Sequence, residues 1–497
     1  MAERFQNFIN GKWVDAANGT TFEDINPANK TEVMGTFPRS DHRDVDRAVE
    51  SAKAHYPTWR GVPAPRRAEI LFRAAEILVR RKEELARLTT QEMGKALKES
   101  QGEVQAAIDM FSYIAGEGRR LWGETTPSEL PEKFALTVRV PLGVVGAITP
   151  WNFPFAIPSA KLAPALIAGN TAVFKPAGDA PLTAVRLVEI LLEAGLPPGV
   201  VNLVHGSGEE AGAPLVRHPD VALISFTGSS EVGREVAIAC AADHRCVSLE
   251  MGGKNPILVM EDADLDLAVD GTIWGGFATS GQRATAASRI LVHKKVMREF
   301  AERLVTKVQA LRLGDGLSAT TDVGPIINEA HLKRVHGYTR LGLKEGAKLL
   351  CGGEIFREGE CKKGFFYTPT VFGDVSSKMR IAQEEIFGPS LGLLPVAGFE
   401  EAIEAANSVR YGLSSAIYTR DVTKAFRAIE LLAAGITYVN ASTIGAEVHL
   451  PFGGIRQTGN GHREGGRQVL DIFTEWKTVY IDYSGKLQRA QIDLGSC

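Results

Sequence analysis

The sequence predicts an α/β protein with a doubly wound parallel sheet, a second α/β domain and a small β element. Short apolar runs at 144–148, 171–174 and 222–226 are typical of buried strands. Helical stretches at 159–168 and 182–194 separate several such runs, and this alternation favours a parallel sheet covered on both faces. A chain of 497 residues is too long for one simple core, so we expect two or three domains.

The predicted elements follow one another in a regular order. Residues 66–122 carry apolar side chains at helical spacing, with Arg and Glu between them. The strand-like runs that come next are 134–140, 144–148, 171–174, 200–204, 222–226 and 247–249. A second α/β series covers about 255–439, and its clearest strands are 257–260, 290–292 and 436–439.

Two further segments, 131–140 and the tail after Trp476, alternate apolar and polar residues without an obvious core partner. This pattern fits edge strands that join subunits, and it also fits an ordinary surface hairpin. The domain boundaries that we expect are 1–122 with 142–251 for a Rossmann-like first domain, 252–448 for the second domain, and 123–141 with 470–497 for an oligomerisation element and tail.

Composition excludes several classes of function. A net charge of −3 and a pI near 6.4 give no support to nucleic-acid binding. No apolar run reaches the ~18 residues that a membrane span needs, and the N-terminus has no apolar signal core, so a cytoplasmic protein is expected. The cysteines predict neither a disulfide framework nor a metal site, because they are scattered at Cys240, Cys246, Cys351, Cys361 and Cys497.

A glycine turn follows the strand at 222–226. It contains Gly228, Ser229 and Gly233 and leads into a helical pattern. Free N–H groups at a helix N-terminus bind pyrophosphate, although this spacing differs from the common dinucleotide fingerprint. Lys175 ends the strand at 171–174, at the edge where open sheets bind ligands; a solvated surface charge is the alternative.

Two polar residues stand where catalytic groups are expected. Asn152 lies between Pro150 and Pro154, which stiffen the turn, so its amide is suited to stabilise an oxyanion or, alternatively, to cap a helix. Glu250 ends an apolar strand before a Gly-Gly turn, where partial burial would raise its pKa and suit it to act as a general base. A solvated carboxylate at a strand end is the alternative for Glu250.

Several motifs together resemble those of the aldehyde dehydrogenase superfamily. The first three are Pro-Trp-Asn-Phe-Pro at 150–154, Glu-Met-Gly-Gly-Lys-Asn-Pro at 250–256 and Gly-Gln-Arg-Ala-Thr-Ala at 281–286. Gln-Glu-Glu-Ile-Phe-Gly-Pro at 383–389 and the glycine-rich segment at 450–465 also match, as does Phe-Thr-Gly-Ser at 226–229. The resemblance extends from Phe8 to about Val479, which is nearly the whole chain.

The resemblance implies a catalytic site with one residue replaced. The family's cysteine nucleophile follows Gly-Gln-Xaa, and here that position is Ala284. Asn152 and the backbone N–H of residue 284 would form the oxyanion hole, and Glu250 would activate the water that hydrolyses a thioester. A parent with cysteine would oxidise an aldehyde to a carboxylic acid, and the chain with Ala284 is expected to bind without turnover. Either the cysteine was replaced deliberately, which the other intact motifs favour, or the chain is a natural non-catalytic homologue.

The resemblance also implies an NAD or NADP site. Lys175 would contact the adenosine ribose, Glu385 would bind the nicotinamide ribose and Phe387 would pack near the ring. NAD-preferring members usually carry glutamate three residues after the lysine, whereas this chain has Gly178, which favours acceptance of NADP. The full set of expected cofactor residues is Trp151, Lys175, Gly228, Ser229, Gly233, Glu385 and Phe387.

The expected substrate tunnel contains Phe153, Ile157, Ala160 and Arg283 by resemblance. Small side chains there suggest a wide tunnel for a medium, long or aromatic aldehyde. The second possibility is a carboxylate-bearing semialdehyde held by Arg283 or Lys161; a structural charge, common at this position in the family, is the alternative for Arg283. A homodimer or homotetramer is expected, and the tail at 483–493 would cross to a neighbouring subunit at the tunnel mouth.

Overall fold

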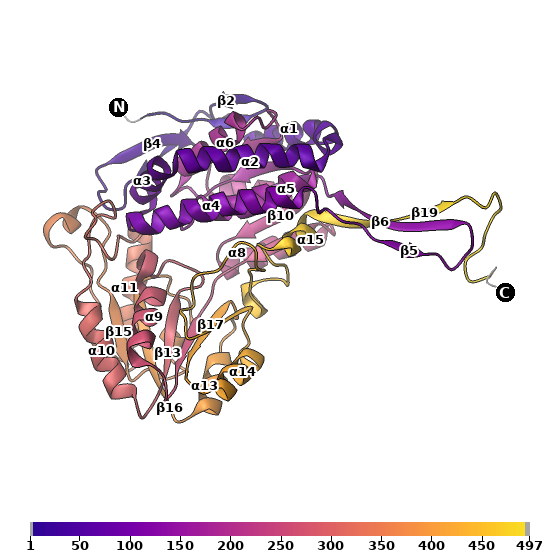
Figure 1. Cartoon of the computed structure of the whole chain (residues 1–497). Coiled ribbons are helices and arrows are strands. Elements are labelled where there is room, and N and C mark those ends of the chain that lie inside the picture. The colour runs from indigo at the N-terminus through magenta and orange to yellow at the C-terminus, as the bar shows by residue number, and fades with distance from the viewer. Residues whose placement is uncertain (1–2, 493–497) are drawn as a thin grey trace.

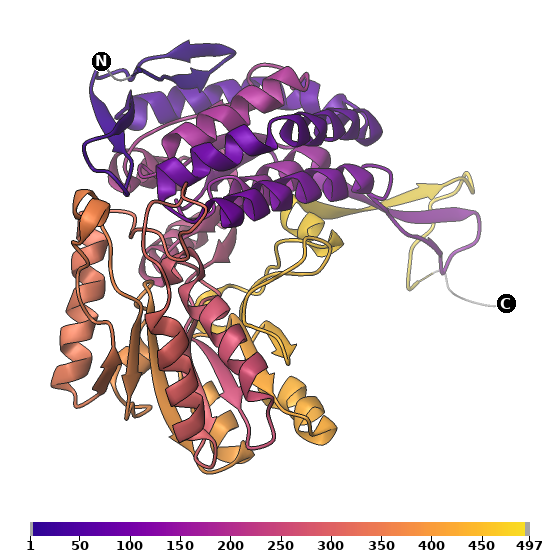
Figure 2. The ribbon, with the colours of Figure 1, turned by 60° about the vertical axis from the view of Figure 1, so that its left-hand side comes forward.

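Two seven-stranded sheets form the body of the molecule, and a thin three-stranded arm projects from it (Figure 1). The structure is a computed structural model that describes residues 3–492. The last residues of the predicted tail, 493–497, lie outside this range. Figure 2 shows the body from a second side, with the first sheet and its helices above the second sheet.

The first sheet has the strand order β11-β10-β7-β8-β9-β1-β2. Its five parallel strands are largely buried, since helices pack on both faces; they are β7 (Val144–Ile148), β8 (Thr171–Lys175), β9 (Val201–Leu203), β10 (Val221–Thr227) and β11 (Cys246–Glu250). The short antiparallel strands β1 (Asn7–Ile9) and β2 (Lys12–Val14) complete one edge. The predicted doubly wound sheet is confirmed, but these two edge strands were not predicted.

Helices cover the first sheet because each presents one apolar face. In α2 this face includes Leu71, Ala74, Ala75 and Leu78, at helical spacing, and α2 packs against α4. The helices of this domain are α1 (His42–Gly61), α2 (Ala64–Arg80), α3 (Lys82–Met93), α4 (Leu97–Glu117), α5 (Ala156–Ala168), α6 (Pro181–Glu193), α7 (Ala213–Arg217) and α8 (Ser230–Ala242).

The second sheet has the order β14-β15-β16-β13-β12-β17-β18 and is parallel except at β14. Its strands are β12 (Asn255–Val259), β13 (Ala287–His293), β14 (Lys348–Cys351), β15 (Thr370–Gly373), β16 (Ser390–Val396), β17 (Ser414–Tyr418) and β18 (Ile436–Val439). Its main helices are α9 (Leu265–Phe277), α10 (Met297–Gln309), α11 (Glu329–Lys344), α13 (Phe399–Asn407) and α14 (Val422–Leu431), with the single turn α12 (Arg380–Gln383) before β16.

The arm consists of β5 (Thr125–Pro127), β6 (Lys133–Pro141) and β19 (Thr474–Asp482), in the order β19-β6-β5. The two alternating segments singled out from the sequence therefore pair with each other, in antiparallel register from Thr474 opposite Pro141 to Asp482 opposite Lys133. A separate hairpin is formed by β3 (Thr21–Ile25) and β4 (Val33–Pro38). Within residues 3–492, every helix is too short or too polar to span a bilayer.

Candidate functional site

The site forms where strands of the two large sheets end and begin. Glu250 is the last residue of β11, and the Gly252-Gly253 turn connects it to β12. Asn152 follows β7, and Ala284 lies three residues before β13 starts at Ala287. The ends of parallel strands thus bring together residues that are far apart in the sequence, as expected for an open α/β sheet.

The loop that carries Ala284 is held in a strained turn. Thr279 and Ser280 both adopt positive φ angles, 53° and 56°, and Gly281 follows with φ 67°. Left-handed backbone is unfavourable for residues with a Cβ, so surrounding contacts must maintain it. Gln282 supplies such contacts: its Oε1 accepts from the Ile327 N–H at 3.0 Å, and its Nε2 donates to Thr279 O.

Asn152 is fixed directly against this loop. Its side chain is 5% exposed, and Nδ2 donates to Gln282 O at 3.0 Å. The N–H of Ala284 has no acceptor among the described residues. The carbonyl oxygen of Ala284, in contrast, accepts a hydrogen bond from Asn255 Nδ2 at 2.7 Å. An amide and a free backbone donor are therefore available at position 284, as an oxyanion hole requires.

Glu250 is a buried carboxyl group without a protein partner. It is 3% exposed, and neither of its oxygens has a hydrogen-bond partner among the described residues. Burial raises the pKa of Glu250 well above its usual value, and the nearby Glu464 carboxylate raises it further, while Lys161 and Arg463 oppose the shift. A carboxylate with a raised pKa is a stronger base than an ordinary glutamate, which favours general base catalysis.

Lys161 was one of the two residues expected to hold a substrate carboxylate, but its side chain is already bound within the protein. Its ammonium group is fully buried, forms an ion pair with Glu464 and donates to Ser225 Oγ at 3.1 Å. The prediction that Lys161 holds a substrate carboxylate is therefore wrong. In the structure, Lys161 binds Glu464, and its own positive charge lies near Glu250.

The glycine turn after β10 approaches the same region. Ser229 caps α8, because its Oγ accepts from the Val232 N–H at 3.2 Å. A Cβ at Gly233 would stand 2.3 Å from Met251 Sδ, and a Cβ at Gly228 would stand 2.4 Å from the Phe226 ring. Glycine is therefore needed at both positions for the close packing of the helix start, and the free N–H groups of α8 can face an anion.

Lys175 stands at the predicted strand end, but it is not a solvated surface charge. Burial lowers the pKa of Lys175 to about 8, and Asp179 opposes the shift. A Cβ at Gly178 would meet only Phe22, at 3.8 Å, so the space beside it is open. Asp179 was not predicted as a site residue; its Oδ1 accepts from Asn328 Nδ2 at 2.9 Å. The sequence did contain a signal for Asp179, because this carboxylate directly follows Gly178.

Glu385 lies directly on the Gly-Gly turn. Its Oε1 accepts from the Gly253 N–H at 2.9 Å, and a Cβ at Gly252 would stand 2.3 Å from Oε2. Burial raises the pKa of Glu385 to about 7, although the Gly253 N–H, Arg334 and Lys254 lower it. The carboxyl group is therefore held on the Gly252-Gly253 turn with one oxygen bound, and it titrates near neutral pH.

Phe387 belongs to an aromatic cluster. Its backbone has φ 60°, and its ring meets the edge of Trp151 at 5.7 Å between centroids. His331, which was not predicted, lies 5.9 Å from both rings, and its Nε2 is 2.7 Å from Phe387 O. The predicted cofactor residues Trp151 and Phe387 are thus in contact, and they share this cluster with α11.

Arg283 is positioned between aromatic rings. Its guanidinium carbon lies 4.9 Å from the Phe153 ring centre and 5.6 Å from that of Trp274. Nη2 donates to Glu99 Oε1 and Nε donates to Thr279 Oγ1, both at 2.9 Å. Among the described residues, these two nitrogens make all the hydrogen bonds of the guanidinium group, and Nη1 makes none. The other predicted tunnel residues, Ile157 and Ala160, are partly exposed in the first turns of α5.

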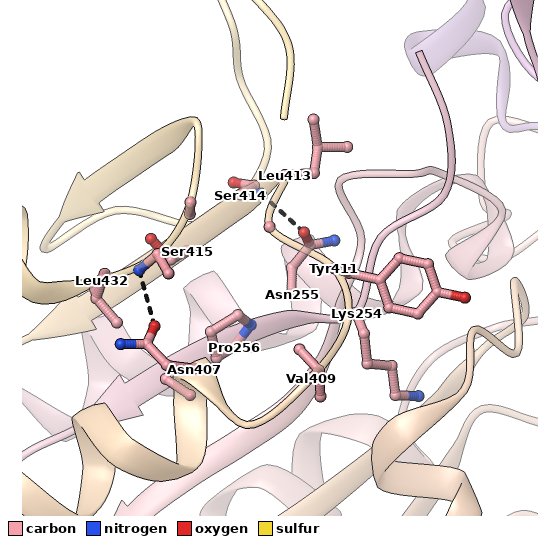
Figure 3. A pocket seen from close by; sticks show the side chains of 14 residues that line it. Lys254, Asn255, Pro256, Asn407, Val409, Tyr411, Leu413, Ser414, Ser415 and Leu432 are labelled. Carbon is pink, nitrogen blue, oxygen red and sulfur yellow. Dashed lines mark hydrogen bonds between the residues drawn. The ribbon is translucent and has the colours of Figure 1, made fainter. Parts of the chain in front are cut away.

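A cavity of about 10 Å³ lies behind the site (Figure 3). Lys254, Asn255 and Tyr411 are among the residues that line it, and its volume is close to that of one water molecule. Among the described residues, no cluster of His, Cys, Asp and Glu has the geometry of a metal site.

Known proteins are similar to this chain over nearly its full length. The family model "Aldehyde dehydrogenase family" matches residues 13–479. An alpha-ketoglutaric semialdehyde dehydrogenase from Bacillus subtilis is 41% identical over 96% of this chain and 98% of its own. An alpha-ketoglutarate semialdehyde dehydrogenase from Haloferax volcanii is 43% identical over 97% of this chain and 100% of its own.

Solved structures give the same result for the fold. Betaine aldehyde dehydrogenase from Staphylococcus aureus in complex with NAD+ superposes with a TM-score of 0.95, at 35% identity, over 99% of this chain and 97% of its own. An NAD-dependent aldehyde dehydrogenase from Sinorhizobium meliloti also gives 0.95, at 38% identity, over the same shares. Motifs, site geometry and relatives agree, and the chain belongs to the aldehyde dehydrogenase family.

Proposed function

We propose that this chain has the site of an NAD(P)-dependent dehydrogenase for a carboxylate-bearing semialdehyde, in a form that binds without turnover because residue 284 is alanine. The observation that carries the proposal is the position of Arg283. Its guanidinium group lies between Phe153 and Trp274, next to the loop of the oxyanion hole, with one nitrogen free of protein partners. Arginine binds carboxylates through such planar, directed donors.

The chemistry follows from the groups around position 284. With cysteine there, its thiolate would add to the aldehyde carbon while Asn152 Nδ2 and the backbone N–H of residue 284 stabilise the negative oxygen. The nicotinamide of a bound cofactor supplies the hydride acceptor. Hydride loss leaves a thioester at residue 284. Alanine has no sulfur and cannot form either covalent species.

Glu250 would complete the reaction by hydrolysis. Its carboxyl group has both oxygens free of protein partners and a raised pKa, so it can take a proton from a water molecule that attacks the thioester. The carboxylic acid then leaves and the thiolate is restored. Lys161 and Glu464 keep opposite charges next to Glu250 and so set how readily it gains and loses the proton.

The proposed substrate class differs from the one that small tunnel residues favoured. Two relatives over 40% identical are named for alpha-ketoglutarate semialdehyde, which carries a distal carboxylate. Arg283 is the group in the predicted tunnel with the matching charge, and Glu99 orients it. Small residues such as Ala160 remain compatible with this substrate, since a short semialdehyde with one carboxylate needs little more room than a medium aldehyde.

The proposed cofactor site combines the start of α8 with Lys175, Glu385 and Phe387. Similar structures are complexes with NAD+, which supports an NAD-type cofactor. The open space at Gly178 supports acceptance of NADP as well, because no side chain occupies the position next to a ribose held by Lys175. The arm β5-β6-β19 supports a homodimer or homotetramer, because its exposed apolar residues include Phe134, Trp476 and Ile481.

The test is Ala284→Cys, alone and with Arg283→Gln, assayed with alpha-ketoglutarate semialdehyde and with neutral aldehydes of similar length. We expect turnover with the single variant. We expect kcat/KM for the semialdehyde to fall about 10- to 100-fold in the double variant, since a hydrogen bond to a charged group is lost. Neutral aldehydes serve as the internal control for intact chemistry. An equal loss for both substrate classes would contradict the role of Arg283.

A second candidate is a non-catalytic protein that senses or scaffolds through its cofactor site. The observation in its favour is Ala284 itself, since no other cysteine follows the Gly-Gln-Xaa motif. Cofactor binding by Ala284→Cys without turnover of any aldehyde would favour this candidate.

A further inference from the structure

Lys254 is a buried ammonium group that the mechanism above does not use. Its side chain is 1% exposed, and Nζ has no hydrogen-bond partner among the described residues. An isolated buried charge is costly, so such a lysine is retained only where a charged partner or a function requires it. Lys254 directly follows Gly253, the residue whose N–H donates to Glu385.

Two acidic groups act on the charge of Lys254. Burial lowers the pKa of Lys254 to about 7, Arg289 lowers it too, and Glu385 and Glu384 oppose the shift. Glu385 is the partner closest to the cofactor site, because its carboxyl group rests on the Gly252-Gly253 backbone. Lys254 is also one of the residues that line the small cavity beside Asn255 and Tyr411 (Figure 3). Other groups that act on Glu385 are Arg334 and Glu231, and Tyr411 is close enough to sense its charge.

We propose that Lys254 is a positioning residue for the cofactor, whose ammonium group stabilises the Glu385 carboxylate when that carboxylate binds the nicotinamide ribose. This inference rests on the proposed role of Glu385. Ribose hydroxyls donate hydrogen bonds to an ionised carboxylate, so cofactor binding favours ionised Glu385. The ammonium form of Lys254 then compensates the new charge inside the protein.

If Lys254 and Glu385 act together, cofactor binding should release a proton at low pH and take up a proton at high pH. Both groups have a pKa of about 7, so Glu385 is largely protonated at pH 6 and Lys254 is largely neutral at pH 8. Forming the ionised pair should therefore release a proton from Glu385 at pH 6 and take up a proton onto Lys254 at pH 8. A purely structural lysine would give no uptake at pH 8.

The experiment is isothermal titration of the unchanged chain with NAD+ at pH 6 and pH 8, in two buffers of different ionisation enthalpy. We expect net release at pH 6 and net uptake at pH 8. Lys254→Met should abolish the uptake and weaken NAD+ binding about tenfold at pH 8. Lys254→Arg, which keeps a charge at every pH, should abolish the uptake and retain the affinity.

The outcomes separate this inference from the proposed function. Failure of the unchanged chain to bind NAD+ or NADP+ would overturn both. Binding with the same uptake at pH 8 in Lys254→Arg would overturn the inference alone. Should Lys254→Met not fold, Glu385→Gln gives a second measurement, because it should abolish the release at pH 6; an unchanged release would contradict the pairing.

Discussion

At the scale of single residues, the site is defined by buried polar groups whose hydrogen-bonding capacity the protein does not fill. Glu250 and Lys254 lack protein partners, Asn152 has a free Oδ1, and Glu385 has one oxygen bound. Buried polar groups are usually satisfied, so a cluster of unsatisfied ones indicates a site prepared for other molecules. Ala284, at the position proposed for the nucleophile, lies among them.

Glu250 gives a prediction for the Ala284→Cys background. Its raised pKa means that the basic form increases as pH rises through a range above 4.5, so thioester hydrolysis should accelerate with pH before it levels off. Glu250→Gln should slow hydrolysis about 10²- to 10⁴-fold and leave a burst of about one NADH per site. Stopped-flow absorbance measures both. A burst followed by unchanged steady turnover would contradict the assignment.

Gly178 gives a prediction for cofactor choice. Gly178→Glu would place a carboxylate in open space close to the predicted ribose site, where it repels a 2′-phosphate. We expect NADP+ affinity to fall about tenfold or more while NAD+ affinity is unchanged or stronger. Titration of intrinsic fluorescence measures both, and Gly178→Gln, of similar size but uncharged, is the matched control. Equal losses for both cofactors would indicate a steric effect instead.

At the scale of elements, periodicity predicted the central strands of the first sheet well, but it predicted helix boundaries and edge strands less well. Helix α5 begins at Ala156, three residues before the predicted start at 159, since Pro158 is tolerated in a first helical turn, where a missing N–H costs little. Strands β1 and β2 were not predicted because each has three residues, too few to show an alternating pattern. The two strands pair with each other, but β1 joins the sheet through β9, about 190 residues later, and no local pattern reveals that contact.

The C-terminal tail gives a prediction at this scale. Strand β19 ends at Asp482, and few contacts follow, such as Gln488 Nε2 with Pro131 O at 2.7 Å. Deleting residues 485–497 should therefore change the melting temperature by about 2 °C or less. Light scattering and the substrate panel of the Ala284→Cys form then test the tail's predicted subunit role. Unchanged assembly and unchanged substrate preference would exclude that role.

At the scale of the whole molecule, the site depends on contacts that only the assembled fold supplies. Asn152 and Glu250 were proposed as site residues because each follows or ends a strand at a stiff or glycine-rich turn, whereas Glu385 was proposed from the family resemblance alone. Sequence motifs did not predict Asp179, His331 or the burial of Lys161, since these depend on packing between α5, α11 and distant loops. Local pattern therefore gives the candidate catalytic groups, and tertiary packing decides which charged side chains are already paired within the protein.

The measurement that tests the central claim most directly is NADH and NADPH formation by Ala284→Cys, with the unchanged chain as control. We predict turnover of carboxylate-bearing semialdehydes by the variant and none by the unchanged chain, because the oxyanion donors and Glu250 are already in place. No turnover by a folded variant that binds cofactor, with semialdehydes or with neutral aldehydes, would contradict the claim that only the nucleophile is missing.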